Sequence, residues 1–426
     1  MGFNEWSQIL PSYKRHHYVP QWYQYRFLDG CSGENKFHYL DMNPETCTAP
    51  NGKKYQRKAL LRWGPPRCFY KENLYTTKFP GWESTEIEER FFGEIDAKGK
   101  DAVQYFSDFT HPSVDPDAFN AFLPYISSQK LRTPRGLGYL KRITKSKGKN
   151  ALLFELQKLH RMHCALWTES VWSIVDASES NTKFIISDNP VTAYNQNCFP
   201  GSHWCRGFNE PGIWLDGTHS IFPLSSTKCL ILTNLSWARN PYGNPLKGRP
   251  HPELFRSAMF NFTTIQTNRM LSEQEVISIN YVIKKRADRY IAAAKEDWLY
   301  PEKHIDLKRW DDIGKSYLLM PDPRSMTFSS EMVIGYKGGR ADSFDEYGRK
   351  VWHSDYNDEK RRSDEWNSFQ AFQGEYARLF GPKRRGVSFE FGRIGKEEDS
   401  EDFHKYHLSL EQEYKPLLRR RRRKRR

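Results

Sequence analysis

Several patterns that mark well-known catalytic or metal sites are absent from these 426 residues. The sequence has no glycine-rich phosphate loop, no G-x-S-x-G elbow and no H-E-x-x-H pair, which excludes the usual P-loop, α/β-hydrolase and zinc-protease sites. None of the seven cysteines is spaced C-x-x-C with another, so we expect reduced, mostly buried thiols. No apolar run is long enough to span a bilayer, and the start lacks a secretion signal. We therefore expect a soluble, intracellular protein without membrane association, nuclear in a eukaryote and otherwise cytoplasmic.

Positive charge is concentrated at the end of the sequence. The formal net charge is +14, and the final segment Arg419–Arg426 carries eight of these charges, which leaves +6 for the other 418 residues. Such a run is expected to be disordered, and it binds phosphate polyanions by counterion release without sequence preference. It is interpreted as a nuclear-import or nucleic-acid patch that would bind DNA or RNA, as a tether for an acidic partner, or as a solvated end.

Aliphatic residues are scarce in the last quarter of the chain. Between residues 325 and 409, only seven of 85 residues are Ile, Leu or Val, whereas fifteen are aromatic. Low aliphatic content with many charges is typical of disorder, but so many aromatic rings argue against an inert linker. The sequence thus predicts a core domain over 1–298, a partly irregular, aromatic-rich and charged extension over 299–418, and the basic tail over 419–426.

The apolar pattern predicts helices first and strands later in the core. Helical spacing and capping signals favour helices near 85–107, from the Asp115 cap to Pro134, and over 151–168 and 273–297. Strand-like runs lie within 171–187 and 219–234. We expect an α+β fold in which the N-terminal helices pack on a small, mainly antiparallel sheet and the last helix packs back across it.

The segment KRHHYVPQWYQYRF, residues 14–27, combines two adjacent histidines, a proline and five aromatic residues. In an extended strand, His16 and His17 face opposite sides, so at most one of them easily joins a given site. Histidine can act as base, acid or metal ligand near neutral pH, and both are candidate catalytic residues. The alternative is an aromatic plug whose imidazoles are hydrogen-bonded to the backbone.

Two further segments carry polar residues where sites are common. In FIISDNPV an apolar run ends in Asp188 and Asn189, at the carboxyl end of a strand, and Asp188 is a candidate catalytic base or metal ligand. An Asx-turn explains the same residues equally well. In SSQKLRTPRG, Gln129 and Arg132 share one helical face, and Arg132 suits a phosphate or carboxylate. A salt bridge at the helix end is the alternative.

The remaining histidines and carboxylates are interpreted mainly as structural. His160 and His163 share a helical face but lack the glutamate of a metalloprotease. Glu88, Glu94 and Asp96 lie on the first helix, where carboxylates of this kind bind Mg²⁺, although a solvated helix face accounts for each of them.

Taken in order, these motifs resemble the family catalogued as domain of unknown function 4238. The resemblance rests on HHYVPQ, the Gln and Arg before TP, SDNPV, FPL and the final ISIN segment, and it spans about residues 14–297. This chain departs from the family in Trp22, where Phe is usual, and in its long C-terminal extension. By resemblance, the positions that carry over are His16, His17, Pro20, Gln129, Arg132, Asp188, Asn189, Pro190 and Asn280. Of these, the resemblance makes Asn280 a substrate-binding candidate together with Gln129, Arg132 and Asn189.

Three hypotheses of function follow. The first is a nucleic-acid-acting hydrolase, a phosphodiesterase or nuclease that uses a divalent metal such as Mg²⁺ or Mn²⁺, with the His, Asp and Arg side chains in a shared cleft. The second is a non-catalytic nucleic-acid-binding module that stacks bases on aromatic residues. The third is a scaffold whose polar motifs tie loops together. The sequence leaves the metal, the oligomeric state and the substrate open.

Overall fold

The computed structural model describes residues 15–381, with gaps at 29–34, 111–112, 206, 250–259, 261–264, 327, 329–331, 336, 355 and 357. The basic tail Arg419–Arg426 and the end of the expected extension lie outside these residues. Within them, no helix combines the length and apolar character needed to cross a bilayer.

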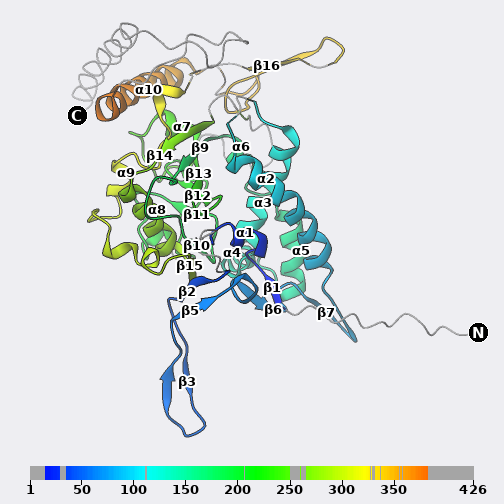
Figure 1. The fold of residues 1–426 in the computed structure, drawn as a ribbon. Coiled ribbons are helices and arrows are strands. Elements are labelled where there is room, and N and C mark those ends of the chain that lie inside the picture. Colours follow the sequence, from blue (N-terminus) through cyan, green and yellow to red (C-terminus); the bar gives the residue numbers. More distant parts are fainter. Residues whose placement is uncertain are drawn as a thin grey trace, which may run out of the picture.

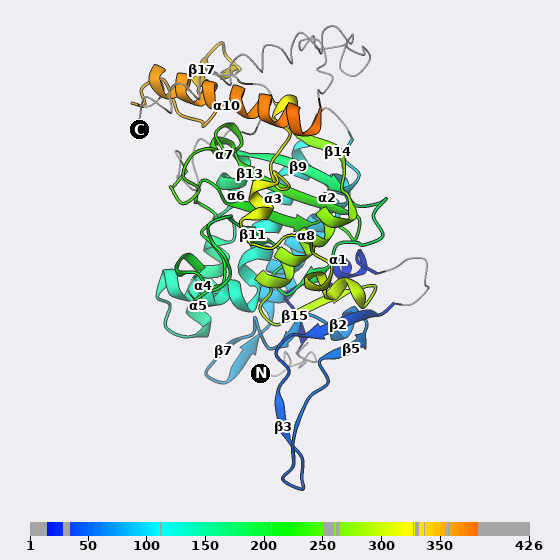
Figure 2. The same cartoon turned by 90° about the vertical axis from the view of Figure 1, so that its left-hand side faces the viewer.

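A five-stranded sheet forms the centre of the protein. Its strands follow the order β11 (Thr192–Tyr194), β12 (His219–Pro223), β13 (Lys228–Asn234), β9 (Ser170–Asp176) and β14 (Gln266–Met270). All neighbours are antiparallel except β14, which runs parallel to β9. Every residue of β12 is buried, because helices cover both faces of the sheet (Figures 1 and 2).

Helices between residues 87 and 168 lie on one side of this sheet, the helices over 273–286 and 312–315 lie on the other, and the helix over 359–380 lies beyond its upper end (Figure 1). The first group packs aromatic rings on the sheet, as in the contact of Phe122 with Trp172. The helices are α1 (Gln21–Tyr25), a π-helical turn (Ile87–Phe92) that continues as α2 (Gly93–Ser107), α3 (Pro116–Arg132), α4 (Pro134–Thr144), α5 (Lys149–Leu159), α6 (Cys164–Thr168), α7 (Leu235–Arg239), α8 (Glu273–Arg286), α9 (Asp312–Lys315) and α10 (Glu359–Phe380).

A second sheet of four strands lies below the first in Figure 1. Its order is β10 (Ile186–Ser187), β15 (Tyr290–Ala293), β2 (Phe37–Asp41) and β5 (Leu60–Trp63), all antiparallel. Four two-stranded ribbons complete the described strands: β1 (Arg15–His17) with β6 (Tyr70–Glu72), β3 (Thr46–Thr48) with β4 (Lys54–Gln56), β7 (Thr77–Phe79) with β8 (Trp82–Ser84), and β16 (Met332–Gly335) with β17 (Ala341–Phe344). The expected α+β fold class is confirmed.

Local capping signals predicted helix starts well. Asp115 accepts hydrogen bonds from the backbone at the start of α3, and Ser272 with Glu275 forms the expected capping box of α8. The predicted end of α3 before Pro134 is confirmed, since this helix ends at Arg132. Pro134 then begins α4, because its fixed φ suits the first helical turn.

Two predicted helices are shorter in the structure. The segment 151–168 divides into α5 and α6, with a turn at 160–163. The helix expected over 273–297 ends at Arg286, because Tyr290–Ala293 pairs as β15 between β10 and β2. Strand pairing with residues 104 to 255 positions earlier in the chain overrides the helical pattern there.

The extension after residue 298 contains a long regular helix. Phe372 and Tyr376 of α10 pack with Trp237 and Met320, so an aromatic stripe docks α10 beside α7 (Figure 1). This contact explains why the extension is rich in aromatic residues. The proposed domain division at residue 298 stays a prediction.

Candidate functional site

His16 and His17 lie on β1 and face different surroundings, as expected for neighbours on a strand. His16 is fully buried, its Nδ1 accepts the backbone N–H of Tyr75 at 2.9 Å, and its ring stacks on Tyr75. His17 packs against the ring of Tyr70. Burial lowers the pKa of His17, against the opposing effect of nearby backbone carbonyls. Packing and backbone contacts therefore position both imidazoles.

Gln129 and Arg132 form one buried cluster at the end of α3. The Gln129 side chain donates to the carbonyl of Tyr18 at 2.7 Å and accepts from Nε of Arg132 at 3.0 Å. Arg132 is 1% exposed and pairs with Asp96 at 2.9 Å. The Tyr75 hydroxyl donates to the Arg132 carbonyl at 2.7 Å, and Tyr75 also contacts His16. Three of the motif residues, His16, Gln129 and Arg132, therefore lie together. We call this group, with Tyr75 and Asp96, the arginine cluster.

A carboxyl group with an unusual pKa borders the arginine cluster. Burial raises the pKa of Glu88 to about 8, although Arg132 opposes the shift, and its Oε2 is buried without a hydrogen-bond partner among the described residues. Burial also raises the pKa of Asp96 against the effect of Arg132. By contrast, Glu94 lies on the exposed face and pairs with Lys98. The described residues contain no group of three or more His, Cys, Asp or Glu that could hold a metal ion.

Asp188 is held by backbone rather than by the histidines. Its carboxylate accepts the N–H groups of Asp288, Arg289 and Tyr290 at 2.7 to 2.8 Å. Burial raises its pKa to about 6, and these three hydrogen bonds oppose the shift. Both oxygens are occupied in closing the distant turn between α8 and β15, so Asp188 anchors a tertiary contact and does not form the local Asx-turn that was the alternative.

The two asparagines among the predicted residues lie apart from the arginine cluster. Asn280 accepts the N–H of Ile185 at 3.1 Å and donates to the Lys183 carbonyl at 2.8 Å, so it ties α8 to the chain before β10. Asn189 donates to Glu210 at 2.9 Å and accepts from Lys130 at 3.2 Å. The structure thus brings His16, Gln129 and Arg132 together and places Asp188, Asn189 and Asn280 in separate networks.

A cavity of about 600 Å³ lies beside α4, and of the predicted site residues only Asn189 lines it. We call it the α4 pocket. Its wall combines three cationic side chains, one carboxylate, two histidines and four aromatic rings: Lys130, Arg135, Arg142, Glu210, His163, His203, Tyr139, Trp204, Phe208 and Trp214. Trp204 and Trp214 are 46% and 49% exposed, although large apolar side chains are normally covered.

A buried ion pair forms the polar floor of the α4 pocket. Lys130 Nζ lies 2.5 Å from Oε2 of Glu210 and also donates to the carbonyl of Val191 at 2.6 Å. Oε1 of Glu210 accepts from Asn189 and from the backbone N–H of Ala193. Burial acts to raise the pKa of Glu210, but Lys130 and the other nearby cations hold it below its usual range. These contacts fix the segment after β11 against α3.

His163 and the aromatic residues form the remaining wall. Burial, with a smaller effect of Lys130, lowers the pKa of His163 to about 3, so its imidazole is neutral, and its Nδ1 is buried without a partner among the described residues. Tyr139 meets Phe208 edge to face, and the Arg142 guanidinium lies 5.2 Å from the Phe208 ring centre. The pocket therefore offers aromatic faces, positive charge and a neutral hydrogen-bonding group.

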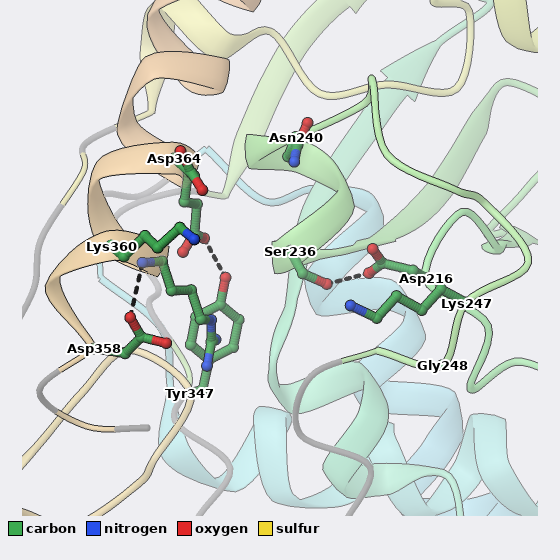
Figure 3. Close-up of a pocket in the computed structure, with 11 residues that line it drawn as sticks. Asp216, Ser236, Asn240, Lys247, Gly248, Tyr347, Asp358, Lys360 and Asp364 are labelled. Carbon is green, nitrogen blue, oxygen red and sulfur yellow. Dashed lines mark hydrogen bonds between the residues drawn. The ribbon is translucent and has the colours of Figure 1, made fainter. Parts of the chain in front are cut away.

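A second cavity of about 350 Å³ lies between α10 and the core (Figure 3). Its wall carries four carboxylates and three cations. Ser236 donates to Asp216, which faces Lys247, while Asp358, the cap of α10, and Asp364 lie beside Lys360 (Figure 3). Since its wall mixes acidic and basic groups and offers little apolar surface, it fits a polar contact between the extension and the core better than a ligand site.

Sequence reasoning missed most of the α4 pocket. His163 was considered only as a partner of His160, whose ring instead packs against Phe91. The signal that existed was the polar loop over 195–218, which contains Trp204 and Trp214. Exposed aromatics in a long loop are typical of binding surfaces.

The fold and its buried motifs define an α+β protein with one mainly antiparallel core sheet and a polar network that links distant segments. A family described as "Protein of unknown function (DUF4238)" matches residues 15–297, which is 283 of the 426 residues, so the chain belongs to this family. The match begins at β1 and extends beyond β15. Comparisons with curated proteins and with solved structures found no match.

Proposed function

We propose that this protein binds a nucleotide unit of a single-stranded nucleic acid in the α4 pocket. The observation that carries the proposal is the combination of half-exposed Trp204 and Trp214 with an excess of positive charge, three cations against one carboxylate, around one 600 Å³ cavity. A nucleotide presents a flat aromatic base and an anionic phosphate, which are the two groups that such a wall recognises.

The residues of the pocket divide between these two groups. Base stacking on tryptophan contributes roughly 1–3 kcal/mol per base and tolerates any sequence, because every base has a π-face. Arg135 is held in position by the carbonyls of Arg286 and Ala287 and by its ion pair with Asp288 at 3.3 Å. Neutral His163, whose Nδ1 has no hydrogen-bond partner among the described residues, suits a hydrogen bond to a base edge.

Quenching of tryptophan fluorescence by adenosine monophosphate, adenosine and inorganic phosphate tests the proposal. We expect saturable binding in the order monophosphate, adenosine, phosphate, and a loss of about tenfold or more in affinity for Trp204→Ala or Trp214→Ala. Trp82→Ala is the matched control, since Trp82 is 57% exposed but lies on β8, away from the pocket. A single-stranded oligonucleotide, measured in the same way, distinguishes a strand from a free nucleotide as the ligand. If the wild type and the three variants bind the monophosphate with equal affinity, the α4 pocket is not the binding site.

A phosphodiesterase or nuclease is the second candidate, and one observation favours it. Glu88, whose pKa burial raises to about 8, lies beside the Arg132 guanidinium and keeps its proton at neutral pH, as a general acid must. The described residues do not fit a Mg²⁺ or Mn²⁺ site, because they form no cluster of three ligands and because both oxygens of Asp188 are occupied by backbone N–H groups.

The hydrolase candidate is tested with labelled DNA and RNA, with and without Mg²⁺ or Mn²⁺. We expect cleavage that is lost in Glu88→Gln, which keeps the shape of the side chain but not its acid. Loss of cleavage in His17→Ala would show that His17 is also needed for the reaction. If the folded wild-type protein cleaves neither substrate under any condition, the candidate is wrong and the binding proposal stands alone.

A further inference from the structure

Two cysteines lie in contact within the segment that joins β11 to β12. The side chains of Cys198 and Cys205 belong to one buried cluster, and the Cys205 thiol donates to the Cys198 carbonyl at 3.7 Å. Both residues are free thiols, 0% and 3% exposed. Their separation along the chain is seven residues, which is outside the C-x-x-C spacing that a sequence search recognises.

A buried arginine completes this group. Arg286 is 0% exposed, and its Nη1 lies 3.2 Å from Sγ of Cys205. Its other hydrogen bonds go to the backbone carbonyls of Cys198 and Asn209, and its guanidinium lies 4.7 Å from the Trp310 ring centre. Among the described residues, no carboxylate pairs with Arg286. A buried cation needs a compensating anion. The Cys205 sulfur is an ionisable atom within hydrogen-bond reach of Arg286, so as a thiolate it would supply that anion.

We propose that Cys205 is a reactive thiolate that hydroperoxides oxidise, and that Cys198 resolves it to a Cys198–Cys205 disulfide. This inference goes beyond nucleotide binding and does not depend on it. It assigns a site of modification to two residues that none of the functional motifs includes.

The reaction balances with a hydroperoxide as the oxidant. The Cys205 thiolate attacks one peroxide oxygen, the O–O bond breaks, and the departing alkoxide takes a proton, which leaves a sulfenic acid on Cys205. The Cys198 sulfur then attacks the sulfenic sulfur, the S–O bond breaks, and hydroxide leaves with the thiol proton as water. Two thiols are oxidised and one hydroperoxide is reduced to alcohol and water.

The environment of Cys205 differs from that of the other buried cysteines. Interaction with Cys198, aided by Arg286 and Ser202, lowers the pKa of Cys205 against the effect of burial. Burial raises the pKa of Cys68 and of Cys164 to about 12. A thiolate is the nucleophilic form, so at neutral pH Cys205 should react much faster than these two.

The test uses the reduced full-length protein and hydrogen peroxide. After oxidation and alkylation of the remaining thiols, we expect two fewer alkylated cysteines and a cross-linked peptide pair that contains Cys198 and Cys205. The rate should reach its plateau at a lower pH than the rate of an ordinary thiol near pKa 8.5, which would continue to gain reactivity up to about pH 8.5.

Three variants make the test specific. In Cys198→Ser, the sulfenic acid should persist and be trapped on Cys205 by a dimedone probe. In Arg286→Gln, the rate should fall about tenfold or more, because the thiolate loses its cation. Cys68→Ser is the matched control and should oxidise as the wild type does.

The proposal is overturned if the folded wild-type protein, checked by circular dichroism, gives no Cys198–Cys205 peptide, or if Cys205 is oxidised no faster than Cys68. These measurements on the wild type decide the question even if Arg286→Gln does not fold.

Discussion

The ammonium group of Lys130 lies 2.5 Å from a carboxylate oxygen of Glu210, and the two residues are 80 positions apart in the chain. The side chains are 12% and 7% exposed, so the pair is mostly removed from water. It joins the end of α3 to the segment that carries Trp204, and it thereby sets the shape of the α4 pocket.

Lys130→Met should destabilise the fold by about 3–5 kcal/mol, because it leaves the buried Glu210 carboxylate without its cation. Urea unfolding measures the loss. The double variant Lys130→Met with Glu210→Leu should recover much of it, since the unpaired charge is then gone. Lys98→Ala is the control, because the Lys98–Glu94 pair is exposed, and it should leave unfolding unchanged. A single variant as stable as the wild type would show that the pair contributes nothing.

Asp188→Ala should cost about 3 kcal/mol, because three backbone N–H groups lose their acceptor at once. Asp188→Asn keeps one oxygen and should cost less. Thermal and urea unfolding give both values. Since a residue needed only for chemistry can be replaced at little cost in stability, unchanged unfolding of Asp188→Ala would contradict the anchoring role described above.

Glu88 should make stability depend on pH. Its folded pKa is about 8 and its ordinary value is 4.5, so the folded state binds the extra proton between these values. The free energy of unfolding should therefore fall as pH rises from about 4.5 to 8. Glu88→Gln should remove this slope and stabilise the protein at pH 8 by about 1–3 kcal/mol. Parallel pH-dependent slopes for the variant and the wild type would assign the effect to other groups.

Phe372 tests whether the extension folds with the core. It is fully buried in the contact with Trp237, so Phe372→Ala should weaken the docking of α10 by about 3–5 kcal/mol through the cavity that it leaves. Hydrogen exchange on α10 should accelerate in proportion. Trp352→Ala, at an 81% exposed position, serves as the control and should have no effect. If the core exchanges faster to the same degree as α10, the two form one cooperative unit and the division at residue 298 is wrong.

The basic tail should control the salt dependence of nucleic-acid binding. Replacing all eight residues of Arg419–Arg426 by Gln should lower the slope of log affinity against log salt by about 0.7 for each lost phosphate contact on a single strand. Fluorescence anisotropy with a labelled oligonucleotide measures the slope. Adenosine monophosphate binding to the pocket should be unaffected, and a loss of that binding would place the nucleotide on the tail instead.

The sequence by itself determined the features that depend on neighbours in the chain. Asp115 and Ser272 cap their helices because a side-chain oxygen reaches backbone N–H groups two or three residues ahead. The runs that form β9, β12 and β13 were recognisable as strands, and the order of the motifs was enough to identify the family.

Only the tertiary structure decided the rest. The segment Tyr290–Ala293 has a helical pattern but pairs as β15, because its partners β10 and β2 lie far away in sequence. The sequence around Asp188 fits a ligand site as well as a structural role. In the folded chain the turn after α8 lies beside Asp188, and the carboxylate accepts three of its N–H groups. Lys130, Glu210 and Trp204 share a pocket, and Cys205 meets Arg286, through contacts between segments about 80 residues apart. The spacing of neighbouring residues in the sequence does not predict such contacts, because they form only when the whole chain packs.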